Sequence, residues 1–246
     1  MIAHPRPAAA DDAALFARLV QIEPASLGHY LAAGAISPAI RALAPAGRDM
    51  NWRMVGRALT IRQPVPDGIP VHRALDDLRR GDILVIDRVG DHHIACVGEM
   101  VARAAFHAGA AGIVVDGVVT DIGQLMTLGL PVYARGLNVL TTRALGLPGA
   151  ELFGPVQIGG QVITTGDILF GDANGVLNLG SDTNNLDGLI TRALADEQRE
   201  VEWRQRLAKG ESLAQLNGSA RARSDQIGEC SRQALNHKPP GPPETD

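Results

Sequence analysis

The amino-acid sequence predicts an α/β domain built around a parallel β-sheet, and three observations carry this prediction. Short apolar runs alternate with helical segments through the middle of the chain, an order typical of strand–helix–strand units with right-handed crossovers. Two of the runs, Ile83–Ile86 and Ile113–Val115, are apolar at every position, as strands covered on both faces tend to be. Beyond Pro148, short β-runs between glycine-containing turns indicate an additional antiparallel layer.

The N-terminal part is expected to be helical. A helix is predicted over Asp11–Ile22, because its apolar side chains recur with the period of a helix, and Pro24 is expected to end it. Two further short helical pieces are expected over Leu27–Ala33 and Pro38–Leu43. Residues 1–24 are therefore predicted to form a helical segment that precedes the main domain.

The main domain is expected to span residues 25–211. Its predicted central strands are Ala58–Arg62, Asp82–Asp87, Ile113–Asp116 and Pro131–Ala134, with helices between them at Glu99–His107 and Ile122–Leu128. The β-runs of the second layer are Val156–Ile158, Gln161–Thr164, Ile168–Phe170 and Val176–Leu179. A long helix is then predicted over Thr183–Lys209, and the proline-containing residues 212–246 are expected to be a disordered tail.

Charge and composition narrow the class of protein. The formal net charge is -4 and no basic patch is visible over the bulk of the chain, so no nucleic-acid partner is expected. Acidic residues stand where a signal peptide needs an apolar run, and no stretch is long and apolar enough to cross a bilayer. Cys96 and Cys230 do not form a disulfide framework. We expect a cytoplasmic protein without a membrane partner.

The first candidate site is Gly98-Glu99-Met100-Val101, which opens a predicted helix. A helix N-terminus presents unpaired N–H groups and the positive end of the helix dipole, and it can therefore cradle a carboxylate or a phosphate. Gly98 allows close approach by a ligand. The alternative is structural: Glu99 simply favours the first turn of a helix, and spacing alone favours this alternative.

The second candidate site runs from Asp116 through Gly117 to Thr120 and Asp121. It follows a buried strand, and in open α/β sheets ligands bind at the carboxyl ends of the strands. A carboxylate there can hold a hard cation such as magnesium, directly or through water. The alternative, at least as strong on these residues alone, is that Thr120 or Asp121 caps the next helix.

Other patterns carry less weight. His93-x-x-Cys96, beside Asp91 and His92, has a spacing that can contribute two zinc ligands, but no second pair is evident nearby. Gly-Asp pairs such as Gly166-Asp167 are typical of tight turns. The chain has lysines only at positions 209 and 238, so a Schiff-base mechanism is not expected, and a lyase acting on keto acids would need a metal.

Taken in order, these segments resemble the RraA-like family, over roughly residues 25–211. The matching residues are Gly56–Thr60, Gly81–Asp87, Gly98-Glu99, Gly112–Gly117, Asp121, Leu130–Gly136, Pro155-Val156, Gly159-Gly160, Gly166-Asp167 and Gly171–Val176. The resemblance implies a phosphohistidine swivelling-type β/β/α domain, with N-terminal helices and a long C-terminal helix, assembled as a homotrimer or homohexamer.

The family also implies an activity. Its members include aldolases that use Mg²⁺ or Mn²⁺ to cleave 4-hydroxy-4-methyl-2-oxoglutarate and 4-carboxy-4-hydroxy-2-oxoadipate to pyruvate through a metal-stabilised enolate. Many also decarboxylate oxaloacetate, and other members bind and inhibit ribonuclease E. The resemblance therefore implies a lyase whose partner is a small keto acid, and the alternative is a non-catalytic binding protein.

Particular residues match the family's site. Asp121 matches the metal-binding Asp, and Glu99 matches the acidic residue that holds metal-bound water. The N–H groups of Met100 and Val101, which follow Gly98, match those that bind the pyruvate carboxylate. A Glu of the neighbouring subunit's late helix completes the family's site. The residues that can match it are Glu197, Glu200 and Glu202.

Thr120 departs from the family pattern, because the family has an Arg there that contacts the keto acid. Thr cannot supply a cation, and losing one preorganised donor costs on the order of 10²–10³ in rate. Arg88 and Arg135 are candidate replacements. Either the aldolase activity is weak or absent, or Thr120 binds a changed substrate on the same scaffold.

Overall fold

The computed structural model describes residues 1–44 and 51–219. The chain forms two compact units, Met1–Ala195 and Asp196–Asp246. The first unit holds the β-sheet and, of the predicted site residues, all except the late-helix glutamates. Within the described ranges, no helix combines the length and apolar composition that crossing a membrane requires.

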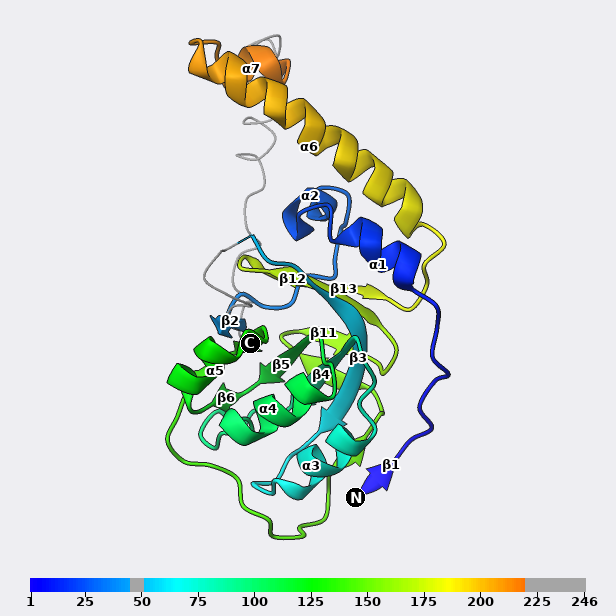
Figure 1. The fold of residues 1–246 in the computed structure, drawn as a ribbon, viewed down its shortest axis with the longest axis vertical. Helices are drawn as coiled ribbons and strands as arrows, with labels where there is room; N and C mark the ends of the chain where they lie inside the picture. The colour runs from blue at the N-terminus through cyan, green and yellow to red at the C-terminus, as the bar shows by residue number, and fades with distance from the viewer. Residues whose placement is uncertain (45–50, 220–246) are drawn as a thin grey trace, which may run out of the picture. The chain divides into compact units, whose positions relative to one another are not determined.

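A nine-stranded sheet organises the first unit, with seven strands in the order β1-β9-β3-β4-β5-β7-β2 (Figure 1). The four central strands run parallel, which confirms the predicted α/β class. They are β3 (Met54–Arg62), β4 (Asp82–Asp87), β5 (Gly112–Asp116) and β7 (Val132–Ala134). Outside these four lie β9 (Glu151–Leu152) and then β1 (Ile2–Ala3) on the β3 side, and β2 (Arg41–Ala44) on the β7 side.

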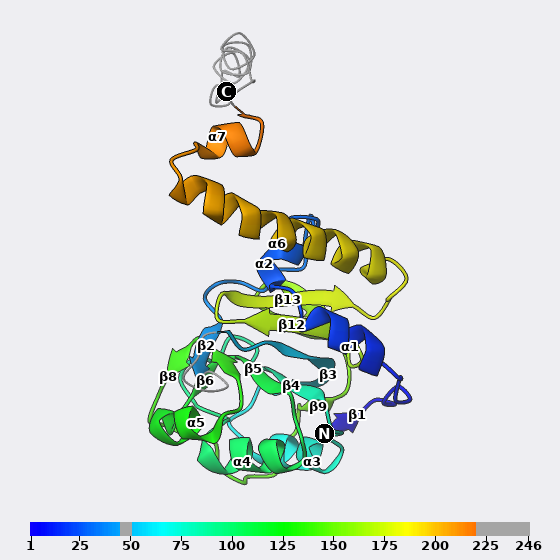
Figure 2. The same ribbon diagram turned by 45° about the horizontal axis from the view of Figure 1, so that its top comes forward.

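Three helices cover one face of this sheet (Figures 1 and 2). They are α3 (Ile69–Asp76), α4 (Glu99–His107) and α5 (Ile122–Leu128). The bounds of α4 and α5 are those predicted, whereas α3 is an addition. In α4, Ala102 and Ala105 recur at helical spacing and are both buried in the apolar core that also contains Leu84 of β4. Small side chains at these positions let α4 pack closely on the sheet.

A β-hairpin packs against the opposite face of the sheet. It consists of β10 (Val156–Ile158) and β11 (Gln161–Ile163). Its apolar side chains share a core with Ile83 and Tyr133. The turn at Gly159 and Gly160 has φ values of 51° and 86°, which glycine adopts without strain, so the predicted hairpin is confirmed.

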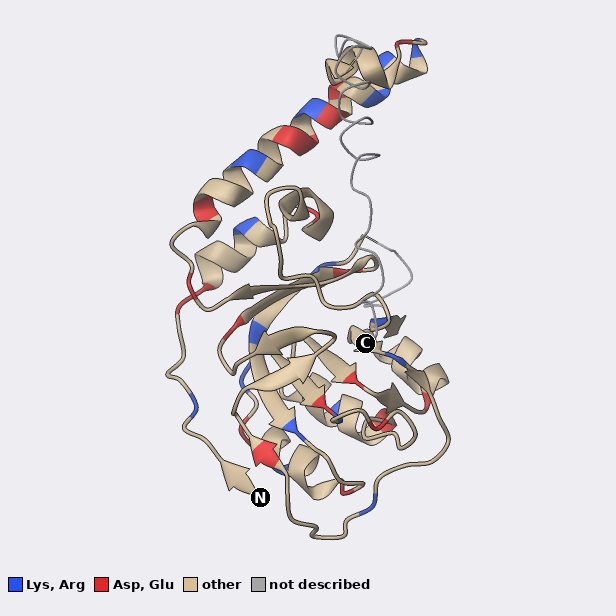
Figure 3. Cartoon of the chain, turned by 180° about the vertical axis from the view of Figure 1, so that it is seen from behind, with Lys and Arg blue, Asp and Glu red and all other residues tan. Residues whose placement is uncertain are grey.

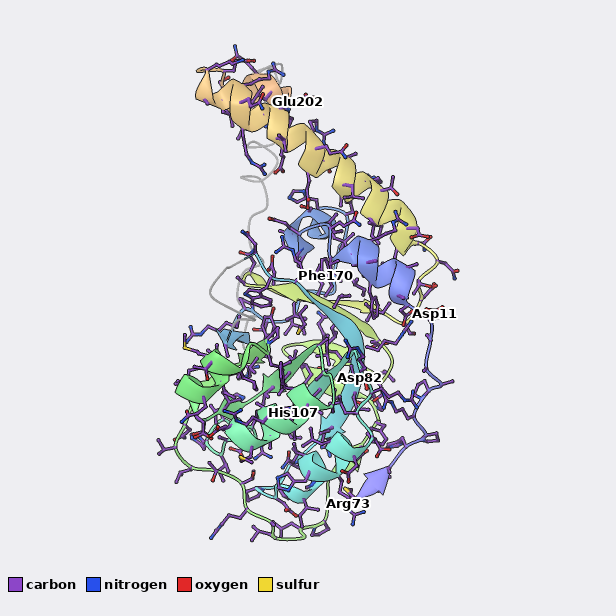
Figure 4. All side chains as sticks on the ribbon, in the orientation of Figure 1. Asp11, Arg73, Asp82, His107, Phe170 and Glu202 are labelled. Atoms are coloured by element: carbon purple, nitrogen blue, oxygen red, sulfur yellow. The ribbon has the colours of Figure 1, made fainter. Side chains whose placement is uncertain are left out.

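The last two strands, β12 (Ile168–Asp172) and β13 (Gly175–Gly180), form a second hairpin that extends the main sheet. β12 pairs antiparallel with β3, so this part of the expected antiparallel layer is continuous with the parallel strands. Phe170 on β12 (Figure 4) shares a third apolar core with α1 (Ala13–Leu19) and α2 (Pro24–Gly28).

Two local predictions are wrong. Of the helix expected over Leu27–Ala33, only Leu27 and Gly28 are helical, as the end of α2. Pro38–Leu43, also expected to be helical, leads into strand β2. Arg41 and Ala42 pair antiparallel with β7, with a bulge before Ala44. Hydrogen bonds to a sheet edge are long-range interactions, and they outweigh the weak helical preference of so short a segment. Pro24 also differs from expectation, because it begins α2 in addition to ending the preceding segment.

The predicted long helix is confirmed as α6 (Leu186–Ala208), and its buried side chains all lie in its first half. Basic and acidic residues alternate irregularly along α6 (Figure 3). A short helix, α7 (Leu213–Leu216), capped by Ser212, lies within the segment expected to be a tail. The rest of that segment, residues 220–246, lies outside the described residues.

Candidate active site

Asp121 lies beyond the carboxyl end of β5, at the start of α5. The short strand β6 (Val118–Val119) pairs with β8 (Gly136–Leu137) just before it. The N–H of Thr120 donates to the carbonyl of Val97 at 3.0 Å, which ties the segment to the start of α4. Asp121 itself has φ 57° and ψ 40°, a left-handed conformation that Asp tolerates better than most residues.

A purely local interpretation would have the Asp121 side chain cap its own helix, α5. The structure shows no such cap hydrogen bond. Oδ2 of Asp121 instead accepts a hydrogen bond from the N–H of Glu99 at 2.9 Å. Asp121 therefore caps α4, which begins with a glycine at the N-cap and has no side-chain cap of its own. The structure thus brings the two candidate sites of the sequence together, around an exposed carboxylate.

Gly98 is required by this close approach. Its φ of -136° is available to any residue, so conformation is not the reason. A Cβ at position 98 would lie 2.5 Å from Asp121 Oδ2 and 2.8 Å from Cγ2 of Thr120. The N–H groups of Met100 and Val101 follow in the same first turn, where an α-helix has no carbonyl of its own to offer them. The Met100 side chain is 74% exposed and leaves this turn open.

Glu99 makes a contact that the sequence interpretation missed. Its Oε1 accepts a hydrogen bond from Nε of Arg103, one helical turn later, at 2.8 Å. The pair is partly exposed, with 33% of the Glu99 side chain and 46% of the Arg103 side chain accessible. The i, i+4 spacing of Glu and Arg was a signal available in the sequence. The carboxylate expected to hold a water is therefore paired with a cation.

Arg88 is engaged elsewhere. Its side chain is fully buried, and Nη1 donates to the carbonyls of Gln63 and Val65, both at 2.9 Å. Nη2 is paired with Asp91. Burial opposes ionisation of Asp91, but backbone N–H donors and the Arg88 guanidinium outweigh it and lower the pKa of this carboxyl. Arg88 therefore organises the loop before Gly98 and does not replace the missing cation at position 120.

Arg135 forms an ion pair elsewhere: its guanidinium donates to Asp116 at the end of β5. The other carboxylate oxygen of Asp116 accepts the N–H of Gly159 at 2.7 Å. Nε2 of His92 lies 3.8 Å from the same carboxylate. Asp116 thus fixes the β10–β11 turn to the carboxyl edge of the sheet, and its role is structural.

Asp67 anchors a neighbouring loop. It is buried, and its carboxylate accepts the N–H groups of Ile69 at 3.0 Å, Leu145 at 3.1 Å and Leu147 at 2.6 Å. Desolvation would raise the pKa of Asp67, but these backbone donors outweigh it and lower the pKa. A buried acid with backbone donors is not recognisable from sequence, since its partners are distant main-chain atoms.

The donor set at Asp121 fits a hydrated hard cation. Within residues 1–44 and 51–219, no three His, Cys, Asp or Glu side chains gather in a way that could hold a metal ion. Mg²⁺ commonly keeps several waters and takes only one or two carboxylates, so one exposed Asp is compatible with it. The late-helix residues Glu197, Glu200 and Glu202 lie on α6, and their role in a neighbouring subunit stays a prediction.

The zinc alternative gains nothing from the structure. Cys96 is buried, and desolvation raises the pKa of its thiol to about 12, which disfavours the thiolate that zinc needs. His92 and His93 are exposed on the loop beside it.

A cavity of about 770 Å³ lies away from these residues. It is bordered by the N-terminal segment 6–13 and by Arg57 and Asp82. These two residues lie opposite each other on neighbouring strands, where the parallel β3–β4 pairing begins. The candidate site occupies the other, carboxyl edge of the sheet. The cavity therefore does not contain the predicted chemistry.

Comparisons with known proteins identify the family. The sequence profile of the RraA-like family, described as Aldolase/RraA, matches residues 15–177. A Halalkalibacterium halodurans protein described as a candidate 4-hydroxy-4-methyl-2-oxoglutarate aldolase is 34% identical over 152 residues, covering 61% of this chain and 71% of that protein.

Solved structures show the same fold. The Streptomyces coelicolor RraAS2 structure, from the RNase ES inhibitor RraA family, has a TM-score of 0.66 and 24% identity, and covers 80% of this chain and 99% of its own. The structure of the RNA-processing inhibitor RraA from Thermus thermophilis has a TM-score of 0.55 and 26% identity. The match covers 63% of this chain and 90% of that one. With a family profile that spans most of the chain, including Gly98 and Asp121, this protein belongs to the RraA-like family.

Proposed function

We propose that this chain is a divalent-metal-dependent lyase that acts on a small 2-oxo acid, as a 4-hydroxy-4-methyl-2-oxoglutarate-type aldolase, an oxaloacetate decarboxylase, or both. One observation carries the proposal: the exposed Asp121 carboxylate lies against the open first turn of α4, 2.9 Å from the N–H of Glu99. An anion cradle and a cation ligand side by side suit a 2-oxo acid, whose carboxylate and keto oxygens are adjacent.

Each residue then has a distinct task. The N–H groups of Met100 and Val101 bind the carboxylate of the 2-oxo acid. Asp121 uses Oδ2 for Glu99, which leaves Oδ1 to hold Mg²⁺ or Mn²⁺. The cation, when bound, supplies Lewis-acid polarisation of the keto group. Gly98 keeps these groups within reach of one another, and Thr120 borders the site without charge.

A second candidate function is a non-catalytic binding protein. Thr120 favours it, because the family's cationic side chain is missing at that position, Arg88 is buried and bonded through both Nη groups, and Arg135 is paired with Asp116. The related Thermus structure is described as an RNA-processing inhibitor. The third alternative, a changed substrate on the same scaffold, is addressed by testing several 2-oxo acids.

The deciding experiment measures pyruvate release from 4-hydroxy-4-methyl-2-oxoglutarate and oxaloacetate by the full-length chain with Mg²⁺. We expect turnover that is lost with EDTA and lowered at least about 100-fold by Asp121→Asn, which keeps a hydrogen-bond acceptor for Glu99 but removes the charge. Asp76→Asn, the same change at an exposed position of α3, is the control. No turnover above buffer by folded protein would refute the lyase.

A further inference from the structure

Arg103 is a cation beside the candidate site that has no assigned role. We propose that Arg103 binds the distal carboxylate of the ligand and so makes the site selective for dicarboxylic over monocarboxylic 2-oxo acids. The inference rests on the proposed function only in taking the site to bind 2-oxo acids. It does not require that any of them be turned over.

The geometry places the guanidinium of Arg103 over the first turn of α4. Side chains of a helix lean toward its N-terminus, so Arg103 reaches back one turn toward Gly98. Its Nε donates to Oε1 of Glu99 at 2.8 Å, and the backbone N–H of the same Glu99 donates to Asp121. Glu99 thus connects Arg103 to Asp121, the residue that we propose holds the metal.

The guanidinium retains binding capacity. Within residues 1–44 and 51–219, its two Nη groups have no hydrogen-bond acceptor, and 46% of the side chain is exposed. A guanidinium presents its N–H groups in a planar fork that matches a carboxylate. Arg103 can therefore keep its bond to Glu99 through Nε while the Nη groups receive a second carboxylate.

The balance of charges at the site favours a role for Arg103 in binding a second carboxylate. Asp121 and Glu99 bring two negative charges, whereas Thr120 brings none and Arg88 and Arg135 are held by other acids. The first carboxylate of a 2-oxo diacid has the helix N-terminus as its partner. Its second carboxylate needs a cation, and Arg103 supplies one in contact with Glu99, at the first turn of the helix that binds the first carboxylate. A purely structural Glu99–Arg103 pair would stabilise α4 without distinguishing one ligand from another.

The test compares two unreactive ligands of equal chain length, 2-oxoglutarate and 2-oxopentanoate. Their dissociation constants are measured by calorimetry with Mg²⁺ on the full-length protein. We expect wild type to bind 2-oxoglutarate at least about tenfold more tightly, the scale of one hydrogen bond to a charged group. Arg103→Met should bring the ratio near one, whereas Arg103→Lys should retain part of it.

The control is Arg73→Met, which removes an exposed arginine from α3 (Figure 4). It should leave the ratio of the two dissociation constants unchanged. A wild type without preference for 2-oxoglutarate, or a preference that survives in folded Arg103→Met, overturns the inference. Selectivity that depends on Arg103, in a protein without turnover, would refute the lyase and leave the inference standing.

Discussion

Asp121 and Glu99 are 22 positions apart in the chain, and the carboxylate of the first caps the helix that the second begins. One side chain therefore joins the start of α5 to the start of α4. Any change that displaces Asp121 should loosen the first turn of α4 and the proposed anion cradle together. The site and a local element of stability are thus coupled.

Gly98→Ala tests this coupling. A Cβ there would overlap Asp121 Oδ2 and Thr120 Cγ2, so we expect about 1–3 kcal/mol of destabilisation and at least about tenfold weaker 2-oxo acid binding. The matched control is Gly123→Ala in α5, where nothing lies within 4 Å of the new Cβ. It should stabilise the protein by about 0.5–1 kcal/mol. Calorimetry and chemical denaturation measure both, and wild-type binding by Gly98→Ala would contradict the role of Gly98.

Thr120→Arg tests whether the scaffold is an aldolase that lacks one cation. The side chain of Thr120 borders Gly98 and Asp121, so an arginine there would bring charge to the proposed keto group. We expect kcat/KM for 4-hydroxy-4-methyl-2-oxoglutarate to rise on the order of 10²–10³. Thr120→Gln adds length without charge and should give little gain. An equal gain from Gln would show that size, not charge, matters.

Asp67 predicts a pH dependence of stability. Folding lowers its pKa, so the ionised form is favoured in the folded state. Its stabilisation is present above the unfolded pKa, about 4, and is lost as pH falls through the lower folded pKa. Asp67→Asn should cost about 1–3 kcal/mol at pH 7, and its difference from wild type should narrow below about pH 4. Urea unfolding across pH measures this, with Asp76→Asn as the exposed control; a constant difference would argue against the anchor.

Cys96 should be inert in the folded protein. It is 4% exposed, and burial raises its thiol pKa to about 12, so few molecules carry the reactive thiolate at pH 8. In a Cys230→Ser background, we expect a disulfide reagent to leave Cys96 unmodified until guanidinium unfolds the chain. Rapid native modification would show that the loop before Gly98 opens readily.

The fold was largely predictable because its main signals are local. The runs at Ile83–Ile86 and Ile113–Val115 are buried as central strands, and α4 and α5 have their predicted bounds. The errors lie where pairing partners are distant in sequence. β2 depends on β7, and β12 joins β3, so neither could be placed from its own residues.

The candidate site was predictable only in part. Gly98 and Asp121 were identified as two separate features, and their contact depends on how the β-strands are arranged. The Glu99–Arg103 pair was visible as an i, i+4 pattern but was not used. Arg88 and Asp67 were not identified as structural residues, because charged side chains are rarely fully buried and nothing in the local sequence marks the exceptions.

Thr120 is held in place by its main chain: its N–H bonds to Val97, and β6 pairs with β8 just before it. Its side chain makes no hydrogen bond among the described residues. Folding therefore places few demands on the identity of residue 120, although this side chain borders the proposed reactive centre. Substitutions at such a position change the side chain beside the site at low cost to the stability of the fold. A saturation library at 120 would therefore give folded proteins that differ mainly in the reactions they can support.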